Sequence, residues 1–159
     1  MFRPLAVDAA GPWNGQIVDA ETSEPLAGVV VLAYWIRYQP SLGGWAGGSH
    51  YASEEVVTRS DGRFTIRSRW AYTIPLIMKV SGPEFVVFKP GYGQWRFRST
   101  AARFDKGELA VIEMPRLRTR EERLMFYRIM GWAPVIPDER TARMREALEI
   151  ERAFLDLRN

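Results

Sequence analysis

The chain of 159 residues contains no cysteine and a single histidine, His50. The absence of cysteine excludes disulfide scaffolds, iron–sulfur sites and cysteine nucleophiles, and the histidine count excludes any site that needs two imidazoles. A catalytic triad of serine, histidine and aspartate would have only His50 to use. These two counts therefore exclude many kinds of catalytic and metal-binding site.

Long apolar runs are also missing. The longest, residues 27–36, is about half of the ~20 residues that a membrane-spanning helix needs, so we expect no membrane span. The first residues lack a positively charged segment followed by an apolar stretch of about 7–15 residues, which is the pattern of a signal peptide. The chain is then either cytoplasmic or a mature form from which a signal has been removed.

The sequence contains no long run of residues that carry charge of one sign. The chain has 22 basic and 19 acidic residues, a net charge of +3, and only three lysines among the basic set. The basic residues are interspersed with acidic ones, whereas a nucleic-acid-binding protein usually shows a concentrated basic stripe. We expect no nucleic-acid partner.

The residues that are abundant predict a β-rich core. Apolar residues make up 47% of the chain and aromatic residues 13%, which suffices for a core without disulfides or metal. A short strand is expected at 16–19. The run at 27–36 is dense in β-branched and aromatic residues, which indicates a strand buried on much of both faces.

The clearest local pattern lies around Asp61-Gly62. Alternating segments at 54–59 and 63–67 flank it, and a glycine there accepts the positive φ of a tight hairpin, with Phe64 and Ile66 sharing one face. Further strands are expected at 75–80, 84–89 and 108–113, while residues 94–107 show no clean periodicity. About seven strands at this spacing are typical of a β-sandwich.

Residues 39–50 hold four glycines and one proline. That composition predicts a long flexible loop, which carries Trp45, and long loops in compact domains are often functional.

The pattern becomes helical after Pro115. Thr119 and Glu122 form a capping box for a helix that is expected to end at Gly131. A second helix is expected from Pro137, with apolar residues at helical spacing: Met144, Ala147, Leu148, Ile150, Phe154, Leu155 and Leu157. Its apolar face must bury either on the sandwich or on a partner. The expected division is an N-terminal arm at 1–12, a β-sandwich at 13–115 and a helical extension at 116–159.

Three blocks of sequence, at 15–33, 57–66 and 88–92, carry a family resemblance. Their order and spacing resemble the carboxypeptidase regulatory-like family of small transthyretin-like β-sandwiches, over residues 14 to about 113. The resemblance implies an antiparallel sandwich of the transthyretin or immunoglobulin type, with Tyr92 packing back as in a tyrosine corner. The position of Asp61 within its turn and the glycine-rich segment 39–50 depart from the family pattern.

The same resemblance implies a non-catalytic module of an exported, surface or periplasmic protein. Two groups of enzymes share this fold, and both depend on histidine. The hydroxyisourate hydrolases use paired histidines and a C-terminal Tyr-Arg-Gly-Ser, and the intradiol dioxygenases hold iron with two tyrosines and two histidines. One histidine fits neither.

No residue pattern points to catalysis, a cofactor or a metal. Glu54 and Glu55 are adjacent on an expected strand and therefore point to opposite faces. The pairs at 121–122 and 138–139 stand at expected helix starts, where they favour the helix dipole. Asp61-Gly62-Arg63 lacks the ligand spacing of a calcium loop. We expect no enzyme, no cofactor and no metal, and an enzyme resting on arginine and glutamate is the remaining catalytic alternative.

The candidate partner-binding residues are mostly aromatic: Tyr38, Trp45, His50, Tyr51, Trp95 and Phe154. Trp45 is the hardest of these to explain as core, because exposed aromatic side chains on loops usually contact something. Contact with protein, contact with sugar and packing onto the sandwich remain open for this segment. For His50, the alternatives are a loop ligand, a pH-sensitive contact and a simple exposed or capped side chain.

These observations lead to one expectation and one alternative. We expect a non-catalytic interaction module, an exported accessory subunit in the periplasm or outside the cell that docks onto protein partners in a larger envelope or extracellular assembly. The alternative is a carbohydrate-binding accessory module that uses the loop aromatics as a stacking platform for a glycan.

Overall fold

The computed structural model describes residues 6–72, 74, 77–98, 109–129 and 136–157. These residues are mainly β, with two C-terminal α-helices and one short 3-10 helix. The elements are β1 (Ala6–Ala10), β2 (Trp13–Asp19), β3 (Val30–Ser41), β4 (Gly44–Val57), β5 (Arg63–Ile66), β6 (Arg69–Tyr72), β7 (Lys79–Lys89), β8 (Gly93–Arg98), β9 (Ala110–Met114), α1 (Arg120–Ile129), η2 (Asp138–Arg140) and α2 (Ala142–Phe154).

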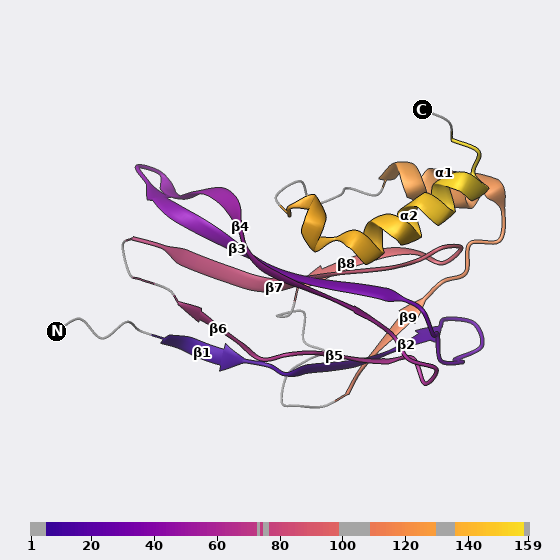
Figure 1. Ribbon diagram of the computed structural model, residues 1–159, viewed down its shortest axis with the longest axis horizontal. Helices are drawn as coiled ribbons and strands as arrows, with labels where there is room; N and C mark the ends of the chain where they lie inside the picture. The colour runs from indigo at the N-terminus through magenta and orange to yellow at the C-terminus, as the bar shows by residue number, and fades with distance from the viewer. Residues whose placement is uncertain (1–5, 73, 75–76, 99–108, 130–135, 158–159) are drawn as a thin grey trace.

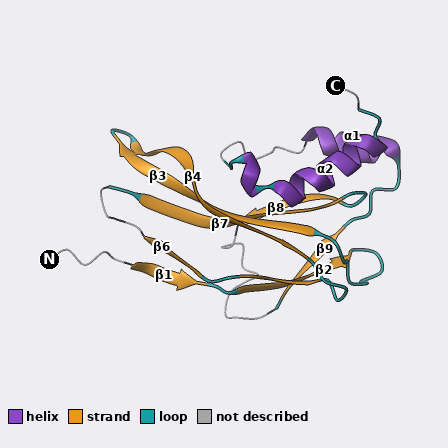
Figure 2. Cartoon of the chain, viewed as in Figure 1, coloured by secondary structure: helices purple, strands orange, loops and turns teal. Residues whose placement is uncertain are grey.

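The elements form three layers (Figure 1). A four-stranded sheet, ordered β4-β3-β7-β8, lies in the middle, and a three-stranded sheet, ordered β5-β2-β9, packs against one of its faces. The helices cover the other face (Figure 2). β1 and β6 pair separately, so residues 6–10 of the expected N-terminal arm form a strand. The expected two-sheet, mainly β architecture with two C-terminal helices is confirmed.

The expectation of a purely antiparallel sandwich is wrong at one pair of strands. β2 and β9 run parallel, from Gly15 opposite Ala110 to Asp19 opposite Met114. The chain reaches β9 from β8, which lies in the other sheet, so no tight hairpin constrains its direction.

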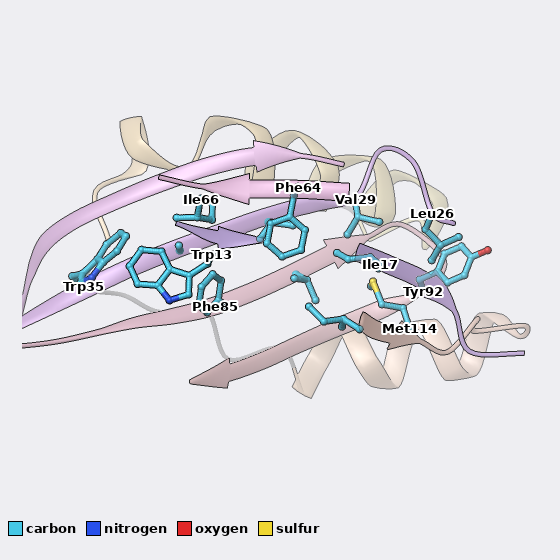
Figure 3. Close-up of a cluster of buried hydrophobic side chains, with 14 of the residues drawn as sticks. Trp13, Ile17, Leu26, Val29, Trp35, Phe64, Ile66, Phe85, Tyr92 and Met114 are labelled. Carbon is cyan, nitrogen blue, oxygen red and sulfur yellow. The ribbon is translucent and has the colours of Figure 1, made fainter. Parts of the chain in front are cut away.

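The inner core lies between the two sheets (Figure 3). Trp13 lies between Trp35 and Phe85, with its ring centre 5.7 Å from that of Trp35 and 6.3 Å from that of Phe85. Phe64 and Ile66 point into this core and are almost fully buried, as the alternation in their strand predicts. The buried members of the core are Trp13, Ile17, Leu26, Val29, Val31, Ala33, Trp35, Ala52, Phe64, Ile66, Val80, Phe85, Val87, Tyr92, Ile112 and Met114.

A second core lies between the four-stranded sheet and the helices. It contains the alternate side chains of β3 and β7, which face away from the inner core, one residue that precedes η2, and the buried side of α2. Its buried members are Val30, Leu32, Tyr34, Val86, Phe88, Ile136, Met144 and Ala147. The expectation that residues 27–36 include a strand buried on both faces is therefore confirmed for β3. The expected apolar face of the second helix is buried on the sandwich in part: Met144 and Ala147 are buried there, whereas Ile150 and Phe154 are exposed.

The start of α1 follows the expected capping box. The Thr119 hydroxyl accepts the Glu122 amide at 3.1 Å, and the Glu122 carboxylate accepts the Thr119 amide at 3.1 Å. The expected stop at Gly131 lies outside the described residues. The second helix begins later than expected, because Asp138–Arg140 form a 3-10 turn before α2 starts at Ala142.

The N-terminus of α2 is capped by the sheet. The amides of Arg143 and Met144 donate to the Glu55 carboxylate at 3.1 and 2.9 Å. These first-turn amides have no acceptor within their own helix, and a negative charge there is favourable for the helix dipole. Glu54 forms an ion pair with Arg67 at 3.6 Å, so these two neighbouring glutamates contact different parts of the molecule.

The turn at Asp61-Gly62 forms, but the expected hairpin does not. Gly62 has a φ of 71°, and its amide donates to the Arg59 carbonyl at 2.9 Å. The strands on either side then separate, because β4 pairs with β3 whereas β5 pairs with β2 in the other sheet. The amide of Ile17 donates to the Gly62 carbonyl at 2.9 Å, which fixes this crossing between sheets to β2.

The expectation of a flexible loop at 39–50 is wrong. β3 continues to Ser41 and β4 begins at Gly44, so that Leu42 and Gly43 alone form the turn of a long β-hairpin. The glycines allow this hairpin to form through an irregular register, and its tip is the candidate site.

Candidate interaction surface

The β3–β4 hairpin extends beyond the rest of its sheet. β7 pairs with β3 only as far as Tyr38 opposite Lys79, whereas β3 and β4 remain paired to Ser41 opposite Gly44. The tip lies at the end of the molecule away from α1 (Figure 1). We use the term distal end for the described residues of 37–53 and 69–83, which comprise the hairpin tip, β6, the turn after β6 and the start of β7.

Two bulges bend the sheet where the distal end begins. On β4, Tyr51 is the extra residue between the pairs Trp35–Ala52 and Ile36–His50. On β7, the extra residues lie at Gly82, where φ is 133° and an added Cβ would lie 3.0 Å from the Tyr34 carbonyl oxygen. Bulges increase twist and redirect a strand. Since both flank the same part of β3, they redirect the hairpin tip relative to the body of the sheet.

A third bulge within the tip requires glycine. Tyr38 on β3 lies opposite two residues of β4, Gly47 and Gly48, and Gly47 has a φ of 65°. A Cβ on Gly48 would lie 3.1 Å from Cγ2 of Ile36 and 3.7 Å from Cε1 of Tyr38. The Tyr38 ring therefore lies beside the Gly48 backbone, on the same face of the hairpin as Ile36.

Trp45 lies on this same face. It pairs with Pro40, directly opposed side chains share a face, and alternation along β3 places Pro40 with Tyr38 and Ile36. Ile36 packs against the second core, so this is the helix-facing side of the sheet. Trp45 is 44% exposed, and Leu42 at the turn is fully exposed.

A second apolar feature lies at the start of β7. Ile74 and Ile77 are 39% and 63% exposed, on a turn in which the amides of Ile77 and Met78 both donate to the Ile74 carbonyl. Because Lys79 pairs with Tyr38, this turn lies at the same end as the hairpin tip. Four of the nine exposed large apolar residues that the described chain shows are thus at the distal end.

His50 is partly buried. Its Nε2 lies 3.0 Å from the Ser53 hydroxyl. Burial lowers the pKa of the imidazole below its usual 6.5, and the positive charges of Arg140 and Arg69 lower it further, while Glu139 opposes them. His50 pairs with Ile36 on the helix-facing side, at the boundary between the distal end and η2.

Two further candidate residues, Tyr51 and Phe154, do not join the surface of Trp45 and Tyr38. Tyr51 packs against the inner core. Phe154 is exposed near the C-terminal end of α2, with the Arg123 guanidinium 3.5 Å from its ring centre. Trp95 lies opposite Val87 on β8, and its side chain is outside the described part of the structure.

Two carboxylates that the sequence did not single out are buried. The Asp19 carboxylate accepts the amides of Glu21 and Thr22 at 2.8 and 3.2 Å and the Tyr92 hydroxyl at 3.0 Å. The Glu21 amide makes the largest contribution to holding the pKa of Asp19 below its usual 3.8. Arg116 donates to the same Tyr92 hydroxyl. Tyr92 thus packs back onto β2, as the sequence predicts, and this cluster closes the turn after β2.

The second buried carboxylate joins the helices to the sheet. Glu151 of α2 receives two hydrogen bonds from the Arg123 guanidinium of α1 and one from the Gly91 amide, at 3.1 Å, in the β7–β8 turn. The side chain of Glu151 is 3% exposed. Within the described ranges, no group of three or more histidine, aspartate or glutamate residues is placed to hold a metal ion.

The fold and this surface define a mainly β, two-sheet protein with a helical layer and an apolar distal hairpin. No model of a known protein family matches the chain, and no curated protein is significantly similar to it. No helix among the described residues combines the length and apolarity needed to cross a membrane.

Proposed function

We propose that this chain is a non-catalytic protein-interaction module that contacts its partner through the distal end. The observation that carries the proposal is the gathering of exposed Leu42, Trp45, Ile74 and Ile77 at one end of the molecule. The module serves as an accessory subunit that docks onto a larger envelope or extracellular assembly.

Burial of these side chains on a partner supplies a driving force. Each large apolar side chain that passes from water to a packed interface contributes up to about 1.5–3 kcal/mol. Clusters of such residues on a soluble surface usually mark contact sites, and a tryptophan is often the residue that dominates binding. The hairpin remains paired as far as its turn, so little backbone entropy is lost when it binds.

The buried carboxylates support the non-catalytic part of the proposal. Asp19 and Glu151 are the groups on which burial could have conferred unusual reactivity. The oxygens of both carboxylates accept hydrogen bonds from neighbouring groups. Each carboxylate thereby joins segments that are distant in sequence. Their observed partners fit roles in folding.

The resemblance to the carboxypeptidase regulatory-like family supports the proposed setting. Its motifs fall on structural positions: Gly62 forms a turn at positive φ, Phe64 is a core residue and Tyr92 is bonded to Asp19. We therefore propose a transthyretin-like sandwich elaborated by a helical layer, and a periplasmic or extracellular location for it.

Carbohydrate binding is the second candidate, and one observation favours it. Tyr38 and Trp45 lie on the same face of the hairpin, and aromatic rings on one face can stack on sugar rings. Tyr51, which was expected among the aromatics of this platform, packs against the inner core instead. Binding on a glycan array that is lost in Trp45→Ala would favour this candidate, and an array without hits would count against it.

The proposed function is tested by the size of the assembly that contains the chain. In an extract of the cells that produce it, we expect Leu42→Ser/Trp45→Ala to shift the chain from a large sedimenting species to the monomer. The matched control is Leu109→Ser/Val111→Ser on and beside β9, since Leu109 and Val111 are 39% and 45% exposed on another face. This control should remain in the large species.

Thermal unfolding of the purified variants separates loss of contact from loss of fold, because all four side chains are exposed and the melting temperatures should stay close to that of the parent chain. If the hairpin variant stayed in the large species, or if both variants left it equally, the distal end would not be the contact surface.

A further inference from the structure

The distal end carries the whole net charge of the chain. Residues 37–53 and 69–83 hold three of the 22 basic residues, Arg37, Arg69 and Lys79, and none of the 19 acidic ones. The rest of the chain is therefore balanced, and its +3 net charge belongs to this end. Arg69 lies with its guanidinium 5.3 Å from the ring centre of Trp35, and Lys79 is exposed opposite Tyr38.

The combination of charge and apolar surface restricts the kind of partner. Three positive charges are few for nucleic acid, whose binding proteins usually carry a concentrated patch or stripe of lysine and arginine. Leu42 and Ile77 are exposed aliphatic side chains, which nucleic acids and sugars do not complement. A second copy of the chain would bring a second positive end, so like charges would meet. A protein segment with carboxylates and apolar side chains complements both features.

The edge of β4 indicates the conformation of that segment. Pro40 has no amide hydrogen, so the directly opposed pair Pro40–Trp45 is not hydrogen-bonded, and the backbone amide and carbonyl of Trp45 point away from β3. β4 is the terminal strand of its sheet. From Gly44 to Ser53 this edge contains no proline, lysine, arginine, aspartate or glutamate, although such residues commonly protect edge strands from pairing.

The two edges of the hairpin differ in this respect. Beyond Tyr38, none of the described residues pairs with β3 on the side of β7. Pro40 stands on this part of β3, where a proline disfavours the addition of a strand. The edge of β4 beside Trp45 carries no proline. Its bulges begin at Gly47, so the regularly paired part of this edge is Gly44–Ala46. Addition of an extended peptide to a free sheet edge is a common mode of recognition, in which backbone hydrogen bonds hold the peptide and side chains give specificity.

We propose that the distal end binds an extended acidic segment of a partner protein along the edge of β4 at Trp45. The apolar side chains of this segment contact Trp45 and Leu42. Its carboxylates alternate onto the other face, where Arg37 lies beside Ser49 of β4, and Lys79 adds to the positive potential of the distal end. The inference rests on the proposed function and names the chemistry of the partner that the distal end recognises.

The experiment measures fluorescence anisotropy with labelled peptides of about ten residues, the length of a long strand. The probe alternates glutamate and valine. One control replaces glutamate by lysine, and another replaces valine by proline to remove every second amide hydrogen. We expect binding of the glutamate–valine peptide to the full chain, and at least about tenfold weaker binding of both controls.

Charge variants of the chain locate the site. Arg37→Glu/Lys79→Glu should weaken binding of the glutamate–valine peptide about tenfold, because two attractions become repulsions. The matched control is Arg59→Glu/Arg63→Glu, which makes the same change in net charge at exposed positions around the β4–β5 turn, at the other end of β4. It should weaken binding no more than about twofold, since those charges lie more than a Debye length away at physiological salt.

Three results would overturn the inference. The first is that the glutamate–valine peptide does not bind. The second is that either control peptide binds as tightly as the glutamate–valine peptide, and the third is that the two charge variants weaken binding of that peptide equally. Tighter binding of single-stranded DNA than of the peptide would also overturn it, in favour of a nucleic-acid partner. Release of Leu42→Ser/Trp45→Ala from its native assembly is measured independently, so the proposed function can stand when this inference fails.

Discussion

Met144→Ala tests whether the helical layer is part of the same folding unit as the two sheets. Met144 is 1% exposed and lies in the second core, between α2 and the outer face of β3 and β7. Its truncation removes the contact of one large side chain with the sheet and leaves a cavity, which costs about 2–5 kcal/mol. Domains of this kind have a total stability of about 5–15 kcal/mol, so the loss is a large fraction of it.

The assay follows thermal unfolding with two probes. Far-ultraviolet circular dichroism at the helix band reports α1 and α2, and tryptophan fluorescence includes Trp13 and Trp35 in the inner core. For a chain of this length, each kcal/mol shifts the melting temperature by about 2–4 °C, so we expect a decrease of about 4–20 °C. Both probes should shift together, because the four-stranded sheet contributes to both cores.

The control is Ile150→Ala on the same helix. Ile150 is 57% exposed, and its truncation should change stability by less than about 1 kcal/mol. If Met144→Ala lowered the helical transition and left the fluorescence transition unchanged, the helices would be an independent appendage and the description of a shared second core would be refuted.

Three further predictions concern single polar groups. Because His50 is the only histidine, its imidazole gives one set of titrating resonances, and its pKa should lie below 6.5 and rise in Arg140→Ala; a value above 6.5 in the parent chain would contradict its burial. The pKa of Asp19 is lowered by folding, so its stabilisation is present above 3.8 and is lost as pH falls through the folded-state pKa. Asp19→Asn should therefore flatten the fall of stability below about pH 4, measured by urea unfolding, and an unchanged acid limb would show that Asp19 is not responsible. Glu55→Ala removes the acceptor for the first-turn amides of α2 and should cost about 0.5–2 kcal/mol, whereas the same cost in Glu54→Ala would argue against a specific cap.

Features set by local chemistry were predictable from the sequence. The capping box at Thr119 and Glu122, the turn at Gly62 and the inward direction of Phe64 follow from hydrogen-bonding groups, backbone freedom and alternation within a few residues. The burial of β3 on both faces was predictable as well, because a continuous run of β-branched and aromatic residues has no polar face to present to water.

Features that depend on distant segments were not predictable in the same way. Asp61-Gly62 looks like a hairpin turn locally, yet the strands on either side pair with different partners, β3 and β2. Glu55 reads as a solvent-exposed strand residue, and only the placement of α2 makes it a cap. Asp19 gave no signal beyond a turn, because its role depends on Tyr92, far along the chain.

The glycine-rich segment shows where composition misleads. Glycine disfavours regular strands on average, and four glycines predict a loop. Here Gly47 takes the positive φ of a bulge, and Gly48 leaves room for Ile36 and Tyr38, so the glycines are part of the hairpin. Trp45 therefore lies on a paired strand and not on the expected loop.

The central claim is that the distal end is the contact surface of this protein. Site-specific photo-cross-linking in the producing cells tests it most directly, with the photoreactive amino acid benzoylphenylalanine placed at Trp45 or, as a control of equal exposure, at Val111. The account predicts a discrete cross-linked protein species from position 45 and none from position 111. Cross-links from position 111 alone, or the same species from both positions, would contradict it.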